Sequence, residues 1–187
     1  MINIEMIGMK RVQSFLNGVE NGTERAVTVG INKTLTKLKT MAKKRVTEEY
    51  AIKSGEIEKT LSIRKANFST LSGTLYSKSP AIALHKFLKS KKKSNLTVVI
   101  KKKEGAKSVN GLSKYNGRPF LATMKNGHSG IFQRKGKRPY PIKELYSLSI
   151  PQMLGHESMK EYVEAEGGAL LENLVMKEVS RILKGYL

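Results

Sequence analysis

The sequence predicts an α+β protein with long N-terminal helices, a central, mostly antiparallel β-sheet or partial barrel, and a long C-terminal helix. Apolar residues recur at three- and four-residue spacing at both ends of the 187-residue chain, whereas short alternating segments and turn residues fill its middle. The length favours a single domain over 1–187. Within it we expect a helical part (1–60), a basic strand-rich part (61–154) and the C-terminal helix (155–187).

Two helices are predicted in the first part. Apolar spacing indicates one over 9–19 and a second over 21–50, where Asn21 and Glu24 have the spacing of a capping box. About 28 residues at about 1.5 Å each span roughly 42 Å, whereas a compact chain of this length has a radius of gyration near ~16 Å. Either a bend at Gly30 or an end that packs on a neighbouring subunit would accommodate such a helix.

The central part reads as short strands after a short helix that includes Ile57 and Leu61. The clearest alternation predicts a strand over 96–103, and Asn126-Gly127 predicts a hairpin turn because both residues tolerate positive φ. The other predicted strands cover 62–67, 72–78, 82–88 with less regular alternation, and the two hairpin arms 120–124 and 129–134.

The last part of the chain is predicted to return to a helix. Pro139, Pro141 and Pro151 favour an extended, irregular segment before it. An apolar face then continues over 158–184, and Gly167-Gly168 weakens its middle by about 1 kcal/mol per Gly relative to Ala.

Charge is the strongest compositional signal. The chain has 35 Lys and Arg against 15 Glu, a net charge of +20, which points to an anionic partner. The segment from Lys86 to Lys143 has 17 basic residues and one acid, a net charge of +16, whereas 155–187 has four basic residues and six Glu, a net charge of −2. The excess therefore lies in the strand-rich part.

Two lysine clusters bracket the predicted 96–103 strand and are expected at loop tips. They are either solvated loops or contacts to phosphates. Lysine supplies charge without reading bases, and the clusters lack interleaved aromatic residues, so any nucleic-acid contact would be directed at the backbone and nonspecific. The candidate polyanion or DNA contacts are Lys91, Lys92, Lys93, Lys101, Lys102 and Lys103.

Residues for catalysis are scarce, and we expect no enzyme activity. The sequence has no Asp and no Cys, which removes thiolate chemistry and Asp-held magnesium. His128 follows the predicted hairpin turn without an evident acid or base partner, and His85 and His156 show no metal-ligand spacing. We therefore predict no catalytic residue, no metal site and no cofactor, and no apolar run approaches the roughly 20 residues of a membrane span.

Several motifs occur in an order that resembles a known family. The first half contains Ile31-Asn32-Lys33-Thr34, Tyr50-Ala51-Ile52-Lys53 and Ser62-Ile63-Arg64-Lys65-Ala66. The second half contains the Phe120 to Arg134 hairpin, then Arg138-Pro139-Tyr140-Pro141-Ile142, then Pro151-Gln152-Met153 before the last helix. This pattern resembles the prophage minor tail protein Z family of long-tailed phages over nearly the whole chain.

The resemblance implies a structural protein that completes the tail at its head-proximal end and is associated with correct DNA placement. Its implied partners are other tail or neck proteins and further copies of itself in a ring, without a membrane. Its implied location is the virion tail, after synthesis in the host bacterial cytoplasm. The candidate loop or assembly residues are Asn126, Gly127, Arg134, Arg138, Pro139 and Pro141.

An alternative function follows from charge alone. A nonspecific nucleic-acid-binding module would use the Lys-rich strand region as its working surface. DNA would then determine the state of the protein in solution, whereas a tail protein would depend on its protein partners.

Overall fold

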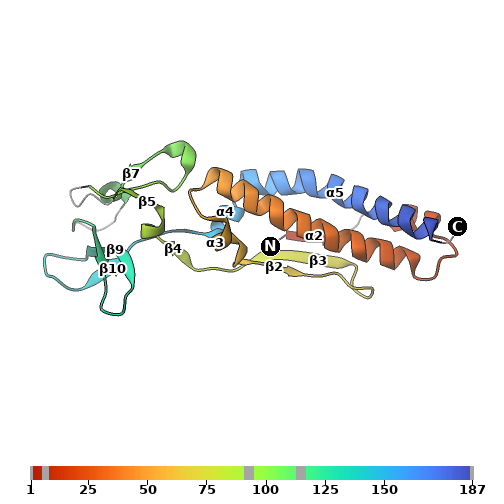
Figure 1. Ribbon diagram of the computed structural model, residues 1–187, viewed down its shortest axis with the longest axis horizontal. Helices are drawn as coiled ribbons and strands as arrows, with labels where there is room; N and C mark the ends of the chain where they lie inside the picture. The colour runs from red at the N-terminus through yellow and green to blue at the C-terminus, as the bar shows by residue number, and fades with distance from the viewer. Residues whose placement is uncertain (1, 6–8, 91–94, 113–116, 186–187) are drawn as a thin grey trace. The chain divides into compact units, whose positions relative to one another are not determined.

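The computed structural model describes residues 2–5, 9–90, 95–112 and 117–185 (Figure 1). It contains long helices and short antiparallel sheets, which confirms the α+β prediction, and no closed barrel occurs among these residues. Contacts divide the chain into two compact units. Unit 1 comprises Met1–Lys43, Glu58–Lys78 and Leu154–Leu187, and unit 2 comprises Lys44–Ile57 and Ser79–Met153. That both form one folding domain stays a prediction.

Unit 1 is built from two long helices and a three-stranded sheet. The antiparallel sheet has the order β1-β3-β2, and Figure 1 shows α5 beside α2. None of the helices in the described segments is long and apolar enough to cross a membrane. The elements are β1 (Ile2–Glu5), α1 (Met9–Phe15), α2 (Gly22–Glu49, whose last six residues belong to unit 2), β2 (Leu61–Arg64), β3 (Ser72–Ser77) and α5 (Glu157–Lys184).

The core of unit 1 forms on two sides of α2. On one side, Gly73 of β3 lies so close to α2 that a Cβ there would be 2.6 Å from Leu35 Cδ1 and 3.0 Å from Ile31 Cγ2. On the other side, a Cβ on Gly30 would lie 3.2 Å from the Cα of Val175 in α5. A side chain at either position would force its neighbours to move, because interiors are close-packed. Helix α2 is therefore the central layer of this unit.

The motif Ile31-Asn32-Lys33-Thr34 connects these layers. Asn32 Nδ2 donates to the Ala66 carbonyl at 3.1 Å, and its Oδ1 accepts from the Ala66 amide at 2.9 Å, which satisfies the backbone just after β2. Thr34 Oγ1 donates to the Gly30 carbonyl at 2.9 Å. Lys33 pairs with Glu178 of α5. The motif therefore has a structural role in this unit.

Glu178 is a nearly buried carboxylate on α5. Its side chain is 4% exposed and accepts hydrogen bonds from Lys33 and from Arg181 Nε, the latter at 2.8 Å. The hydrogen bond from Lys33 lowers the pKa of Glu178, that from Arg181 acts in the same direction, and burial opposes both. The pKa of Glu178 is therefore lower in the folded state than in the unfolded state. The Glu178 contacts stabilise the fold at pH values above the pKa of the unfolded state, and this stabilisation disappears as pH falls through the pKa of the folded state.

We expect Glu178→Gln to lower the free energy of unfolding by about 1–2 kcal/mol at pH 7, because it loses charge-assisted hydrogen bonds to two cations. The difference from wild type should be constant above about pH 5 and shrink below about pH 4, near the ordinary Glu pKa. Urea unfolding at several pH values measures it. Glu172→Gln is the matched control, since Glu172 is exposed and 3.8 Å from Arg11. Equal losses in both variants, or a loss independent of pH, would contradict this account.

Several helix predictions in unit 1 are confirmed, and others are corrected. Helices α2 and α5 are continuous through Gly30 and Gly167-Gly168. Helix α1 ends at Phe15 instead of Val19, because the chain turns there and the Val19 amide donates to the Leu16 carbonyl. Asn21 has φ 52°, not the extended conformation of a capping box, and β1 was not predicted.

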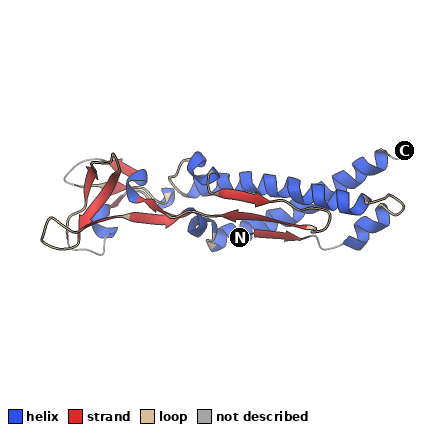
Figure 2. Cartoon of the chain, turned by 90° about the horizontal axis from the view of Figure 1, so that it is seen from below, coloured by secondary structure: helices blue, strands red, loops and turns tan. Residues whose placement is uncertain are grey.

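Unit 2 contains three small antiparallel sheets, whose strands are drawn red in Figure 2. Their orders are β10-β9-β8, β5-β6-β7 and β11-β4. The elements are α3 (Ser54–Glu58), β4 (Ala81–Ala83), the 3-10 helix η1 (Leu84–Phe87), β5 (Leu88–Ser90), β6 (Thr97–Val98), the 3-10 helix η2 (Lys102–Glu104), β7 (Lys107–Ser108), the 3-10 helix η3 (Val109–Leu112), β8 (Phe120–Thr123), β9 (Ser129–Arg134), β10 (Ile142–Glu144), β11 (Tyr146–Ser149) and α4 (Ile150–Leu154). The last residues of α3 and α4 belong to unit 1.

The predicted strand over 96–103 is mostly wrong. Only Thr97–Val98 forms a strand, because the chain then pairs with the residues that follow α2. Tyr50 forms a β-bridge with Lys101, the Ala51 amide donates to the Ile100 carbonyl at 2.9 Å, and η2 begins at Lys102. Leu61, expected in a helix, begins β2.

The hairpin prediction is confirmed, whereas the segment after it is more regular than expected. Strands β8 and β9 match the predicted arms, with Phe120 opposite Phe132. The Pro-rich segment was predicted to be irregular but leads into β10, β11 and α4. Pro151 lies in the first turn of α4, where its missing N–H has no intrahelical partner to lose.

Candidate nucleic-acid interface

The positive charge of the protein is concentrated in unit 2. Its sequence contains 20 Lys and Arg and five Glu, a net charge of +15 out of the +20 of the chain. Unit 1 has 15 basic residues and ten Glu, a net charge of +5. Any contact with a polyanion is therefore expected in unit 2, because phosphate binding scales with the number of cations presented.

The candidate lysines occupy different environments. Lys91, Lys92 and Lys93 lie outside the described residues. Lys101 is half-buried, with its Nζ 3.8 Å from Glu49 Oε1, 3.9 Å from Glu104 Oε1 and 5.9 Å from the centroid of the Tyr50 ring. Its charge is thus already balanced by two carboxylates inside unit 2.

Lys102 and Lys103 belong to η2 and differ from each other. Both side chains are exposed, but Lys102 Nζ donates to the Thr47 carbonyl at 2.6 Å and so supports the last turn of α2. Glu104 pairs with Lys107, and this hydrogen bond lowers the pKa of Glu104, so its carboxylate stays charged near Lys101. Of the second lysine cluster, Lys103 is therefore the residue most open to a ligand.

A groove of about 580 Å³ lies beside Lys101. Its walls are largely apolar, and they include Leu84, Val98, Ile100, Leu112 and Leu148. Lys101 and Lys107 also line the groove, together with Glu104, which pairs with both lysines. The positive charge in the groove is therefore partly balanced within unit 2.

Asn126 and Gly127 form the turn between β8 and β9 as predicted. Gly127 has φ 82°, the Met124 amide donates to the His128 carbonyl at 2.8 Å, and the Gly127 amide donates to the Met124 carbonyl at 2.9 Å. Asn126 Oδ1 accepts from the His128 amide at 3.1 Å. These two residues therefore determine the shape of the turn.

The prediction that His128 lacks an acidic partner is wrong. His128 Nε2 lies 2.9 Å from Glu144 Oε2, and the Tyr146 hydroxyl donates to the same oxygen at 2.7 Å. Burial alone would raise the pKa of Glu144, but hydrogen bonds from Tyr146 and His128 outweigh it and lower that pKa. The His85 ring packs edge-on against His128 with centroids 6.4 Å apart. The antiparallel pairing of β8, β9 and β10 brings His128 to Glu144, whereas Tyr146 comes from β11, which pairs with β4 just before η1.

This cluster holds the β8–β9 turn against β10 and β11. No group of three or more His or Glu in the described part of the chain is arranged to hold a metal ion, and the sequence has no Cys. His156 is far along the chain, at the start of α5 in unit 1. The hydrogen bonds to Glu144 therefore connect the turn with β10 and β11.

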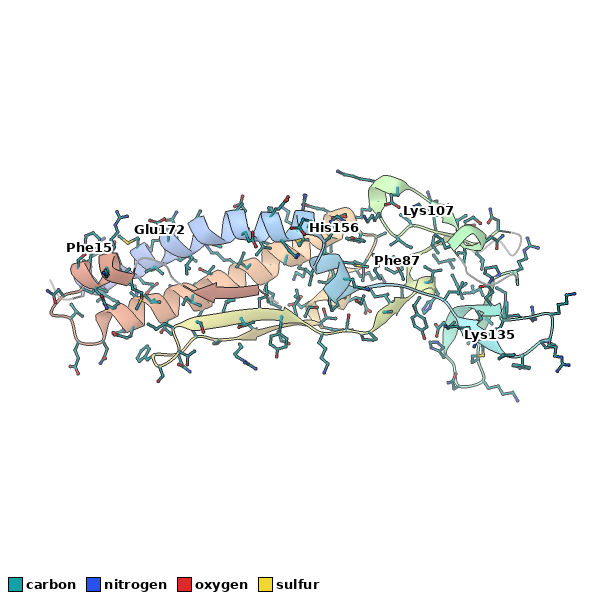
Figure 3. The ribbon with its side chains drawn as sticks, turned by 180° about the vertical axis from the view of Figure 1, so that it is seen from behind. Phe15, Phe87, Lys107, Lys135, His156 and Glu172 are labelled. Carbon is teal, nitrogen blue, oxygen red and sulfur yellow. The ribbon has the colours of Figure 1, made fainter. Side chains whose placement is uncertain are left out.

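Arg134, Arg138, Pro139 and Pro141 lie at or within the loop between β9 and β10, and all four are exposed. Arg134 is the last residue of β9 and stacks its guanidinium 4.9 Å from the centroid of the Phe120 ring. Tyr140 in this loop is 76% exposed. Figure 3 labels Lys135, where the loop leaves the strand.

Of the three cations in this loop, the sequence predicted a role only for Arg138, as a loop or assembly residue, and Lys135 and Lys137 were not among the candidates. Lys135 and Lys137 are exposed, and together with Arg138 they follow β9 within four residues and without an acid. The signal was present, since the run Lys135-Gly136-Lys137-Arg138-Pro139-Tyr140-Pro141 combines cations with an aromatic residue. The candidates were instead taken from the two clusters with more consecutive lysines.

Comparison with known proteins identifies one family. The model of the family "Prophage minor tail protein Z (GPZ)" matches residues 6–187. No curated protein and no solved structure matches this chain significantly.

Proposed function

The chain belongs to the prophage minor tail protein Z family, and from this premise we propose that it completes the phage tail at the head-proximal end. Its structural role in the tail follows from the family itself. The observation that carries the proposal is the extent of the match, which covers 6–187 and so both units. The polar contacts of Ile31-Asn32-Lys33-Thr34 and of the His128 cluster connect elements within each unit. Such contacts suit a structural protein without catalytic chemistry.

We further propose that the protein works as a homo-oligomeric ring in contact with other tail or neck proteins. Exposed large apolar and aromatic side chains support this, because such side chains are common anchors in protein interfaces. They occur in both units and comprise Phe15, Phe68, Tyr76, Leu112, Leu121, Tyr140, Tyr146 and Leu148. Asn126, Gly127, Arg134, Arg138, Pro139 and Pro141 are proposed to shape the loops that make these contacts.

Nonspecific DNA contact is the third part of the proposal. A subunit that surrounds a DNA passage gains from attraction between cations and phosphates without any base readout. The net charge of +15 in unit 2 supports this contact. The candidate lysines remain Lys91, Lys92, Lys93, Lys101, Lys102 and Lys103.

Antibody labelling of intact virions tests the tail-completion proposal. We expect the label at the head-proximal end of the tail, and we expect deletion of the gene to abolish infective particles while heads and tails still form. Complementation with the wild-type gene should restore the titre. Label at the other end of the tail, or none on purified particles, would refute the proposal.

A nonspecific nucleic-acid-binding module is the second candidate, and the charge of unit 2 favours it. Size in solution discriminates the two functions. A tail protein should change its oligomeric state when tail or neck proteins are added, whereas the binding module should respond to DNA and ignore those proteins.

A further inference from the structure

In the described part of unit 2, the loop between β9 and β10 presents a group of exposed cations. We call residues 135–141 the basic loop. It contains Lys135, Lys137 and Arg138, followed by Tyr140, and every residue of the loop is exposed. The loop contains no acid, and the nearest acid after it in sequence is Glu144.

The carboxylates of unit 2 are engaged elsewhere. Each of its five Glu contacts a cation or a histidine outside the basic loop. The pairs are Glu48 with Arg45 at 3.9 Å, Glu49 with Lys101 at 3.8 Å, Glu56 with Lys86, Glu104 with Lys107, and Glu144 with His128 at 2.9 Å. Within the described residues, no carboxylate lies within 4.0 Å of the Lys135, Lys137 or Arg138 cations.

The base of the loop is well supported. Arg134 pairs with Ile142 across β9 and β10, and the Lys135 amide donates to the Pro141 carbonyl at 3.1 Å. The Arg134 guanidinium stacks on Phe120, and the buried Gln133 side chain donates to the Gly117 carbonyl. Pro139 and Pro141 restrict φ on both sides of Tyr140. The cations are thus presented from a restrained hairpin, which reduces the entropy lost on binding.

We propose that the basic loop binds the phosphate backbone of DNA and is the main DNA contact of this protein. The inference rests on the DNA contact in the proposed function and assigns it to Lys135, Lys137 and Arg138 instead of Lys101 and Lys102. Arg138 can hold a phosphate with two parallel hydrogen bonds, the lysines add point charges, and the Tyr140 hydroxyl can donate to a phosphate or its ring can pack on a sugar or base.

An acidic protein fits this loop less well. Protein interfaces need a complementary patch of about 800 Å² per partner with an apolar centre. Three cations and one aromatic side chain on a hairpin loop match instead the repeated charge of a phosphate backbone, which a small element can contact without such a patch.

Fluorescence anisotropy with a labelled random-sequence DNA duplex tests the proposal on the full chain between 50 and 300 mM salt. The loop variant combines Lys135→Gln, Lys137→Gln and Arg138→Gln. Loss of three phosphate contacts should reduce the slope of log affinity against log salt by about 2.7, which is about 500-fold weaker binding at 0.1 M salt. Tyr140→Ala should weaken binding with the slope unchanged, because the tyrosine carries no charge.

Three controls isolate the loop. Lys10→Gln with Lys37→Gln and Lys65→Gln removes the same charge from exposed positions of unit 1 and should change the slope by less than one contact, about 0.9. The charge-conserving variant Lys135→Arg, Lys137→Arg, Arg138→Lys should retain binding. The variant Lys101→Gln with Lys102→Gln and Lys103→Gln should lose at most one phosphate contact, that of Lys103, and so change the slope by at most about 0.9. Melting temperatures check that each variant folds.

The outcomes separate this inference from the proposed function. If the loop variant binds DNA like wild type, or if the variant of Lys101, Lys102 and Lys103 loses more DNA affinity than the loop variant, the assignment to the loop is wrong. DNA contact elsewhere on the protein would then still be supported. If the wild-type protein shows no salt-dependent binding to DNA, the proposal of DNA contact is wrong as well. The tail role is then still tested by virion labelling. If poly-glutamate at equal charge competes as well as unlabelled DNA, the loop binds an acidic protein and the inference is overturned.

Discussion

Leu35→Asp is expected to unfold the protein or to lower its melting temperature by about 10–20 °C, which corresponds to a loss of about 5 kcal/mol or more. Leu35 is fully buried and lies against Gly73 of β3, as does Ile31. Removal of a buried leucine side chain costs about 2–5 kcal/mol, and the desolvation of a carboxylate adds to that cost. Thermal unfolding followed by circular dichroism measures the effect. Ile31→Asp should behave in the same way.

Thr36→Asp is the matched control for this change. Thr36 is the next residue of α2, is exposed, and acquires the same charge. Its effect should stay within about 0.5 kcal/mol. If Leu35→Asp keeps the melting temperature of wild type but fails to enter tails, the stripe of α2 faces a partner protein and its packing on β3 is wrong.

Gly30→Leu should cost about 3 kcal/mol, at the upper end of what overpacking a core usually costs. A Cβ at this position would lie 3.2 Å from the Cα and 3.3 Å from the Cβ of Val175, and a backbone atom cannot move aside by rotating a side chain. Helix propensity acts in the opposite direction by about 1 kcal/mol, because Leu is a better helix former than Gly. Chemical denaturation gives the net free energy of unfolding.

Gly168→Leu is the corresponding control in α5. Nothing lies within 4 Å of a Cβ at Gly168, so only the gain in helix propensity should remain, up to about 1 kcal/mol. Val175→Ala combined with Gly30→Leu should recover part of the loss, since the two sites are in contact and their effects are then non-additive. Stabilisation by Gly30→Leu would show that α2 and α5 do not approach closely at this point.

The sequence by itself determined the class of the fold and its two long helices. Stripes of apolar residues along α2 and α5 report directly which face of a helix is buried, and this requires no knowledge of the partner. The β8–β9 hairpin was also predictable, because Asn126-Gly127 specifies a turn locally. Gly127 indeed adopts φ 82° in the structure. The motifs that predicted the family also needed no tertiary information, and the match over 6–187 confirms them.

The tertiary structure alone decided which groups meet. The alternation over 96–103 indicates burial on one face but not the hydrogen-bond partner, and Tyr50 and Ala51 take up backbone groups that a longer strand would have used. Glu49 and Glu104 balance Lys101, and sheet pairing brings Glu144 to His128. Contacts between distant segments depend on the packing of the whole chain, whereas periodicity and turn residues act over a few neighbours. For this reason the charged region was evident from the sequence, whereas the lack of a carboxylate within 4.0 Å of Lys135, Lys137 and Arg138 among the described residues was not.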